Sequence, residues 1–116
     1  MGFPIGPMLV STDLVGDPAA LRIVTSVNGE ERQNDVVASL VFDVPTLIGY
    51  LSQITTLVTG DVIFTGTPAG VGASQGKSLA DGDVITTTID RLGTLVNRCR
   101  RVSGHTGLGR QAEATA

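Results

Sequence analysis

The feature that most limits how this chain can fold is an alternating apolar segment that runs directly into an Asn-Gly pair. Every second residue from Leu21 to Val27 is apolar or β-branched, and Asn28-Gly29 follows at once. Alternation places one set of side chains on each face of a strand, and Asn-Gly is the strongest short-range signal for a type I′ hairpin turn. The pattern predicts a β-hairpin whose return strand covers residues 30–33.

Four further segments have the composition of strands. Residues 84–89 and 94–102 are separated by a turn signal at residues 91–93, which predicts a second hairpin. Residues 61–65 form a compact β-branched and aromatic run, which predicts a buried strand that delivers a glycine-rich loop. Residues 8–12 are a short apolar run closed by polar residues and predict an edge strand.

One segment has the period of a helix. Apolar residues recur at spacings of three and four over residues 44–54, with Asp43 in position to cap the first turn and Pro45 inside it. Gly49 costs about 1 kcal/mol relative to Ala within a helix, which suggests a close neighbour at that point. Together the signals predict a β-rich α+β fold with two β-hairpins and one amphipathic helix at about residues 44–54.

The length and composition suit a single folded unit followed by a tail. The chain has 116 residues, a hydrophobic fraction of 41% and only 3% aromatic residues, so one aliphatic core is expected. Residues 103–116 offer almost nothing to bury and are predicted to be a disordered tail. We therefore expect one domain over residues 1–102.

Charge and hydropathy narrow the possible partners. The formal net charge is -3, and the largest basic cluster is the short run Arg98, Arg100 and Arg101, so nucleic acid is not expected as a partner. No stretch approaches the roughly 20 apolar residues of a membrane span, and the first residues do not have the pattern of a secretory signal. We expect a cytoplasmic protein without a membrane partner.

The sequence has one cysteine and one histidine. Cys99 lies in an alternating apolar segment, which favours a reduced thiol packed as a small hydrophobe. His105 lies six positions further on in the predicted tail. A catalytic Cys/His pair is therefore not expected.

The most unusual segment is the loop Thr65-Gly66-Thr67-Pro68-Ala69-Gly70-Val71-Gly72. Three glycines allow the backbone to adopt left-handed conformations and to approach a ligand closely, while the proline stiffens the turn. A loop of this kind can direct N–H groups and a threonine hydroxyl at an anion. A phosphate-binding P-loop would need a lysine at its end, and none is present here. On residue types alone, a purely structural turn remains an equal alternative.

Several segments of the chain, taken in order, resemble blocks of the fumarylacetoacetate hydrolase family. The resemblance covers roughly residues 3–102, and the TGTPAGVG block preceded by GDVI and by the NGE hairpin is highly specific. The matching blocks are Ile5-Gly6-Pro7, Val27-Asn28-Gly29-Glu30 with Arg32-Gln33, Phe42-Asp43, Leu47-Ile48-Gly49-Tyr50-Leu51-Ser52, Gly60 to Gly72, Gly82-Asp83-Val84 and Leu92-Gly93-Thr94-Leu95.

The resemblance implies a fold and a chemistry. Members of the family have a mixed β-sheet roll, are usually dimeric, and use Mg²⁺ or Mn²⁺ to act on small 2-oxo or 1,3-dioxo acids by C–C hydrolysis, decarboxylation or isomerisation. By this similarity Thr67 would donate a hydrogen bond to the substrate carboxylate, assisted by the backbone around Gly66. The alternative role for Thr67 is to cap its own turn, which threonines often do.

The resemblance also implies what this segment does not supply. In the family the metal ligands are two glutamates and an aspartate upstream of the Gly-Pro block, and a substrate-binding lysine immediately precedes that block. No metal ligand and no catalytic residue is therefore assigned here. Asp81 and Asp83 bracket Gly82 and could bind Ca²⁺ weakly, but a turn role is favoured because a Ca²⁺ site needs six to eight oxygens.

Three interpretations follow from these observations. The first is an enzyme-family chain that is inactive alone and forms a homo-oligomer or joins a partner chain supplying the upstream half, since the helix would otherwise expose an apolar face. The second is a non-catalytic module for oligomerisation or for binding a small carboxylate. The third, disfavoured by the ordered blocks, is an unrelated β-domain that lacks a helix between two hairpins.

Overall fold

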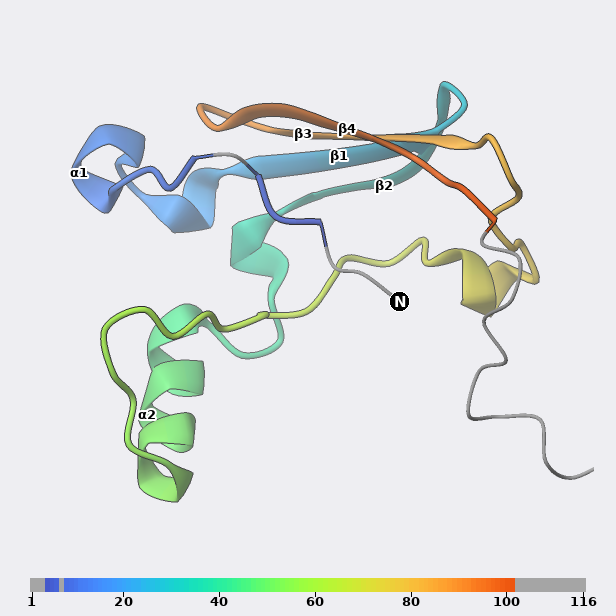
Figure 1. Cartoon of the computed structure of the whole chain (residues 1–116). Helices are drawn as coiled ribbons and strands as arrows, with labels where there is room; N and C mark the ends of the chain where they lie inside the picture. Colours follow the sequence, from blue (N-terminus) through green and yellow to red (C-terminus); the bar gives the residue numbers. More distant parts are fainter. Residues whose placement is uncertain (1–3, 7, 102–116) are drawn as a thin grey trace, which may run out of the picture.

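The computed structural model describes residues 4–6 and 8–101. Its centre is a four-stranded antiparallel sheet in the order β2-β1-β3-β4 (Figure 1). The strands are β1 (Arg22–Val27), β2 (Glu30–Val36), β3 (Val84–Ile89) and β4 (Gly93–Arg98). Both predicted hairpins are confirmed, with a longer return strand in the first and a shorter second strand in the second. The tail predicted for residues 103–116 lies outside the described residues.

The first hairpin turns where the sequence predicts. Asn28 has a φ of 52° and Gly29 a φ of 83°, which are the left-handed conformations that a type I′ turn requires at both central positions. The Asn28 side chain also reaches the second hairpin, because its Nδ2 donates to Asp83 Oδ1 at 2.8 Å and its Oδ1 accepts from the Val84 amide at 2.9 Å. The turn therefore joins the two hairpins as well as closing one of them.

A β-bulge interrupts the pairing of β1 with β2. Thr25 lies opposite Gln33 while Ser26 lies opposite Glu31, so Arg32 is an extra residue without a partner in β1. A bulge bends the strand and changes the face to which the following side chains point. All pairing within this sheet is antiparallel, so the parallel strands of a mixed sheet are not found among the described residues.

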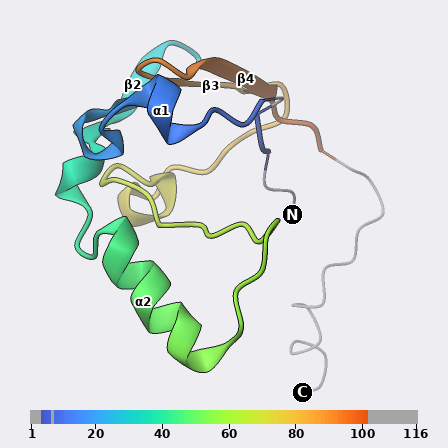
Figure 2. The ribbon, with the colours of Figure 1, turned by 90° about the vertical axis from the view of Figure 1, so that its left-hand side faces the viewer.

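The predicted helix is confirmed with the predicted bounds. Helix α2 covers Val44–Ile54, and Asp43 caps it through a carboxylate oxygen that accepts from the Thr46 amide at 2.8 Å. The helix stands apart from the sheet (Figure 2). Nothing lies within 4 Å of a Cβ built at Gly49, so the close neighbour expected there is not found in the described part of the chain.

Two predicted strands are wrong. Residues 8–11 form no ladder and lead into the short helix α1 (Thr12–Val15), and residues 61–65 are irregular rather than a buried strand. A strand needs a neighbour for its backbone groups, and neither segment pairs with β2 or β4, the two open edges of the sheet. Val62 and Phe64 are accordingly 63% and 65% exposed.

Short 3₁₀ segments connect the main elements. They are η1 (Pro18–Ala20), η2 (Val37–Ser39) and η3 (Gly72–Gln75). Segment η1 leads into β1, η2 follows β2, and η3 ends the glycine-rich loop. None of the helices in residues 4–6 and 8–101 has the length and hydropathy needed to cross a membrane.

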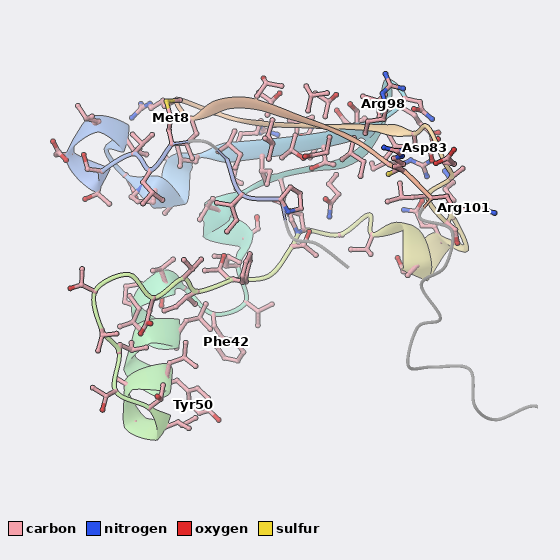
Figure 3. The ribbon with its side chains drawn as sticks, in the orientation of Figure 1. Met8, Phe42, Tyr50, Asp83, Arg98 and Arg101 are labelled. Carbon is pink, nitrogen blue, oxygen red and sulfur yellow. The ribbon has the colours of Figure 1, made fainter. Side chains whose placement is uncertain are left out.

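Little of the apolar surface is covered. Among the described residues, Val15 and Leu21 are the buried apolar side chains, at 4% and 7% exposure. Helix α2, which is described along its whole length, contains no buried residue. Phe42 and Tyr50, which Figure 3 places around α2 and away from the sheet, are 60% and 63% exposed. An exposed apolar surface of this extent is typical of a surface that contacts another protein segment, and is rare on a soluble monomer.

Candidate functional site

The glycine-rich loop lies beneath the sheet on the path from α2 to η3 (Figure 1). Its position is set by two close approaches of backbone to backbone. A Cβ at Gly70, whose φ is 105°, would overlap the carbonyl oxygen of Arg32, and a Cβ at Gly72 would overlap that of Lys77. Only glycine allows such approaches, so these two glycines hold the loop against β2 and against its own exit. Gly70 and Gly72 thus have a structural reason to be glycine that needs no ligand, although the close approach of Gly70 is to strand β2 and not within a tight turn.

The two predicted ligand-binding residues, Gly66 and Thr67, have a different environment. Nothing lies within 4 Å of a Cβ at Gly66, and both residues are exposed. Gly66 has a φ of 109°, and no described residue accepts a hydrogen bond from its amide. This part of the loop is therefore left with polar groups available, while the part around Gly70 is docked.

Thr67 is engaged by a residue from β2. The side-chain nitrogen of Gln33 donates to Thr67 Oγ1 at 2.8 Å and to the Pro68 carbonyl oxygen at 2.8 Å. Because a carbonyl can only accept, the Gln33 amide must present its nitrogen here. The predicted alternative, in which Thr67 caps its own turn, is not found among the hydrogen bonds of the described residues. Gln33 lies within one of the family blocks, but its residue type and place in the sequence do not indicate a role.

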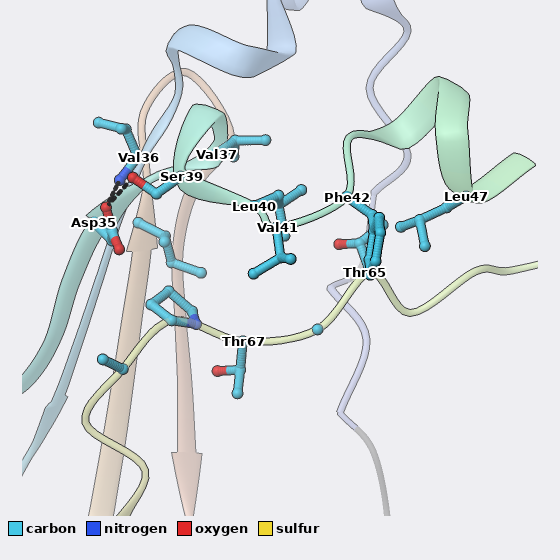
Figure 4. A pocket seen from close by; sticks show the side chains of 14 residues that line it. Asp35, Val36, Val37, Ser39, Leu40, Val41, Phe42, Leu47, Thr65 and Thr67 are labelled. Carbon is cyan, nitrogen blue, oxygen red and sulfur yellow. Dashed lines mark hydrogen bonds between the residues drawn. The ribbon is translucent and has the colours of Figure 1, made fainter.

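A cavity of about 510 Å³ lies beside the loop (Figure 4). Its walls come from β1, β2, η2, the first residues of α2 with the segment before it, and the loop itself. Most of the lining is apolar, including Ile23, Leu40, Phe42 and Leu47, and the loop contributes residues 65–69. Apolar walls with a few polar groups are typical of a small-molecule site.

Asp35 gives this cavity one anionic corner. Its Oδ1 accepts hydrogen bonds from the Ser39 hydroxyl at 2.6 Å and from the Val36 amide at 2.8 Å (Figure 4). The Ser39 hydroxyl first, and then the Val36 amide, lower the pKa of Asp35 below its usual value of 3.8, so the group is ionised at neutral pH. A carboxylate ligand would be repelled by this charge.

A small ionic network attaches the segment that follows η3 to the first hairpin. Lys77 Nζ lies 3.0 Å from Glu30 Oε1, and Arg32 Nη2 lies 3.2 Å from Glu30 Oε2. The hydrogen bond from Lys77, followed by the charge of Arg32, lowers the pKa of Glu30. Lys77 and Arg32 therefore share the single carboxylate of Glu30, and the Nε and Nη1 atoms of Arg32 are buried without a hydrogen-bond partner among the described residues.

The carboxylates of the described residues do not fit a divalent metal. No group of three or more His, Cys, Asp or Glu side chains comes together within this part of the chain. Asp83 and Asp61 instead stabilise turns, because they accept from the Ala80 and Val58 amides. Asp81 accepts from the amide of Arg101, 20 positions further along the chain. The expected turn role is observed for Asp83, whereas the side chain of Asp81, which lies in the same turn, bonds to the segment after β4. No metal-dependent step is derived from these residues.

Cys99 is a free, half-buried thiol. Partial burial fits the predicted packing of Cys99 as a small hydrophobe, and the reduced state of the thiol stays a prediction. The predicted lack of a Cys/His pair concerns His105, which lies outside the described residues.

Comparison with known proteins extends this picture. Residues 2–100 match the family described as "Fumarylacetoacetate (FAA) hydrolase C-terminal". The oxaloacetate tautomerase YisK of Bacillus subtilis (strain 168) is 45% identical over 97 residues, which cover 82% of this chain and 32% of that protein. The chain therefore spans about a third of the length of this relative.

Solved structures agree in fold. The fumarylacetoacetate hydrolase of the psychrophile Exiguobacterium antarcticum has a TM-score of 0.78 and 42% identity, covering 85% of this chain and 36% of its own. Maleylpyruvate hydrolase from Sphingobium sp. SYK-6, in complex with manganese(II) and pyruvate, has a TM-score of 0.75 and 40% identity, covering 82% of this chain and 34% of its own. The match over nearly the whole described region shows that the chain belongs to the fumarylacetoacetate hydrolase family, within its C-terminal domain.

Proposed function

We propose that this chain provides the carboxylate-binding side of an active site that acts on small 2-oxo or 1,3-dioxo acids. The named relatives are a tautomerase and two hydrolases whose names specify small oxo acids, which supports this substrate class. The reaction itself, whether C–C hydrolysis, decarboxylation or isomerisation, is a further proposal, and we favour hydrolysis because two of these relatives are hydrolases.

One observation carries the proposal. The Thr67 oxygen already accepts a hydrogen bond from Gln33, so the hydroxyl proton remains available for a ligand. The adjacent Gly66 amide is a second donor without an acceptor among the described residues. Two neighbouring donors on the loop that lines the cavity suit the carboxylate of a small acid.

We further propose that residues outside the described part supply the divalent metal, Mg²⁺ or Mn²⁺. Manganese accompanies pyruvate in the Sphingobium maleylpyruvate hydrolase, whereas no three His, Cys, Asp or Glu side chains come together among the residues described here. Those outside residues would come from upstream sequence or from a partner chain, either in a homo-oligomer or in a complex of different chains. The exposed apolar surface around α2 supports such an association.

Binding of oxalate, an unreactive small dicarboxylate, tests the central claim. We expect calorimetry of the chain with oxalate, in the absence of added metal, to show saturable binding. Thr67→Val, which keeps the shape and removes the hydroxyl, should weaken that binding by about tenfold, because a hydrogen bond to a charged group contributes roughly 1.5–3 kcal/mol. Ser74→Ala removes a hydroxyl from η3, outside the cavity lining, and is the matched control.

Turnover separates the enzyme from a non-catalytic module. We expect no Mn²⁺-dependent cleavage of an acylpyruvate by the chain alone, and cleavage when the upstream portion of a family relative is added as a separate polypeptide. Oxalate binding without any restored turnover would favour the non-catalytic module instead. If oxalate produces no saturable heat, the carboxylate-binding role itself is wrong.

A further inference from the structure

The position of Gln33 depends on the bulge at Arg32. Without the bulge, continuing the pairing from Glu30 opposite Val27 would place Gln33 opposite Val24, on the other face of the sheet. With Arg32 inserted, Gln33 lies opposite Thr25 and shares a face with Glu30. That face is the one toward the loop, since Gln33 there contacts Thr67 and Pro68. One inserted residue therefore determines whether Gln33 can reach the loop.

The contact constrains how the Thr67 hydroxyl can be used. A hydroxyl has one proton to donate and two lone pairs, and a glutamine amide nitrogen has two protons and no acceptor capacity. Gln33 therefore cannot take the Thr67 proton; it can only fill an acceptor position on the oxygen. Its second proton goes to the Pro68 carbonyl, so the two bonds hold successive residues of the loop against β2.

A second anchor lies next to the first on both segments. Gly70 approaches the carbonyl of Arg32, the residue before Gln33, so the loop is held at the bulge by backbone packing and by the Gln33 side chain. Gln33 is half-buried and is not among the residues that line the cavity. Its effect on a bound ligand would therefore be transmitted through Thr67 rather than through direct contact.

We propose that Gln33 is a positioning residue for ligand binding: placed by the Arg32 bulge, it fixes the Thr67 hydroxyl so that the proton is directed at the ligand carboxylate. This inference rests on the proposed function, because it assumes that Thr67 is a carboxylate donor. It adds a residue and a structural device, the bulge, to that site.

The first test needs no ligand. In ¹⁵N-labelled protein, Thr67→Val should shift the side-chain amide signals of Gln33, because one of its two acceptors is removed. The side-chain amide of Asn34, which points to the other face and bonds to Glu31, should stay in place and is the internal control. Unchanged Gln33 signals would overturn the inference, whatever the protein binds.

The second test is a double-mutant cycle with oxalate as the probe. Gln33→Met keeps a similar length and adds no charge, and we expect it to weaken oxalate binding about fivefold, the effect of one neutral hydrogen bond. In the Thr67→Val background the same change should alter binding by less than twofold, because the hydroxyl that Gln33 positions is gone. Asn34→Leu, on the opposite face of the same strand, should leave binding unchanged.

The outcomes separate the two proposals. Equal weakening by Gln33→Met with and without the Thr67 hydroxyl would mean that Gln33 only supports the fold, and the inference would be wrong. Shifted Gln33 signals together with no oxalate binding by the unmodified chain would instead refute the carboxylate-binding function and, with it, a positioning role toward such a ligand. Retained backbone ¹⁵N–¹H spectra for each variant establish that a loss of binding is not a loss of folding.

Discussion

The sheet and helix α2 are both formed as their sequences predict, yet their surroundings differ. Each strand of the sheet is bonded to at least one neighbour, and Asn28 ties one hairpin to the other. Helix α2 has its own cap and its own internal bonds, but every one of its residues is at least partly exposed. A helix satisfies its backbone by itself, whereas a strand cannot. Correct secondary structure is therefore no evidence that a segment is packed.

The largest effect is expected where the loop is fastened to the sheet. Gly70→Val should lower the free energy of unfolding by about 3 kcal/mol, because a branched side chain is strained at a φ of 105° and would overlap the Arg32 carbonyl. Gly66→Val is the matched control, since its φ of 109° is similar but its Cβ would meet open space. It should cost only the backbone strain, about 1–2 kcal/mol.

Urea unfolding followed by circular dichroism measures both variants. The informative quantity is the difference between the two midpoints, because the strain of a positive φ is common to both. Equal midpoints would mean that the loop is not docked on β2, and the division into a fastened and an open half of the loop would be wrong.

A smaller effect separates the buried from the exposed apolar side chains. Leu21, which precedes β1, is 7% exposed, whereas Ile48 in α2 is 44% exposed. Leu21→Ala should cost about 2 kcal/mol and Ile48→Ala less than about 0.5 kcal/mol in the same urea experiment. If Ile48→Ala instead lowers the free energy of unfolding by as much as Leu21→Ala in dilute protein, α2 is covered in solution, most directly by a second copy of the chain. Sedimentation at several protein concentrations would detect such self-association.

The smallest effect concerns the cap of α2. The Thr46 hydroxyl and amide lower the pKa of the Asp43 carboxyl below its usual value of 3.8, because both interactions favour the ionised form. Since the folded pKa is the lower one, the cap's contribution is present above pH 3.8 and is lost as the pH falls through the lowered pKa. Asp43→Ala at pH 7 should speed exchange of the Thr46 amide hydrogen about fivefold.

Asp43→Asn provides the control for this pH dependence. Asparagine is also a good cap but does not titrate. In Asp43→Asn, the exchange rate of the Thr46 amide hydrogen below pH 3.8 should therefore follow only the intrinsic pH dependence of amide exchange, without an added increase from loss of the cap. A step of the same size in Asp43→Asn would assign the acid sensitivity to another carboxylate, and Asp83, whose pKa is lowered by the Ala80 amide and then by Asn28, would be the next to test.

Local structure could be predicted from the sequence, whereas contacts with distant segments could not. The bounds of α2 and the Asn28-Gly29 turn could be predicted because caps and turns are encoded by adjacent residues. Residues 61–65 have the composition of a strand but no strand beside them, and composition does not reveal whether a neighbour is present.

For the candidate site, too, the local features could be predicted and the long-range contact could not. The loop itself was evident from its glycines, and Thr67 from a family block. The role of Gln33 could not be inferred, because it depends on a bulge in strand register and on a contact between residues 34 positions apart. A register shift of one residue can be read from a sequence only where apolar and polar residues alternate clearly. The residues of β2 are mostly polar on both faces, so the bulge cannot be recognised from their order.

The pairing of β1 with β3 has a consequence for how the molecule acquires its shape. The two strands are joined by the Thr25–Thr87 hydroxyl contact across 62 positions, and Asn28 meets Asp83 across 55. Contacts between residues so far apart in the sequence can form only after a long loop has closed. The entropy cost of closing that loop is paid before the contacts contribute stability, and this slows folding. During synthesis, the hairpin of β1 and β2 therefore leaves the ribosome before β3. Until β3 pairs with β1, the backbone N–H and C=O groups along that edge of β1 are unpaired and can bind strands of other polypeptides.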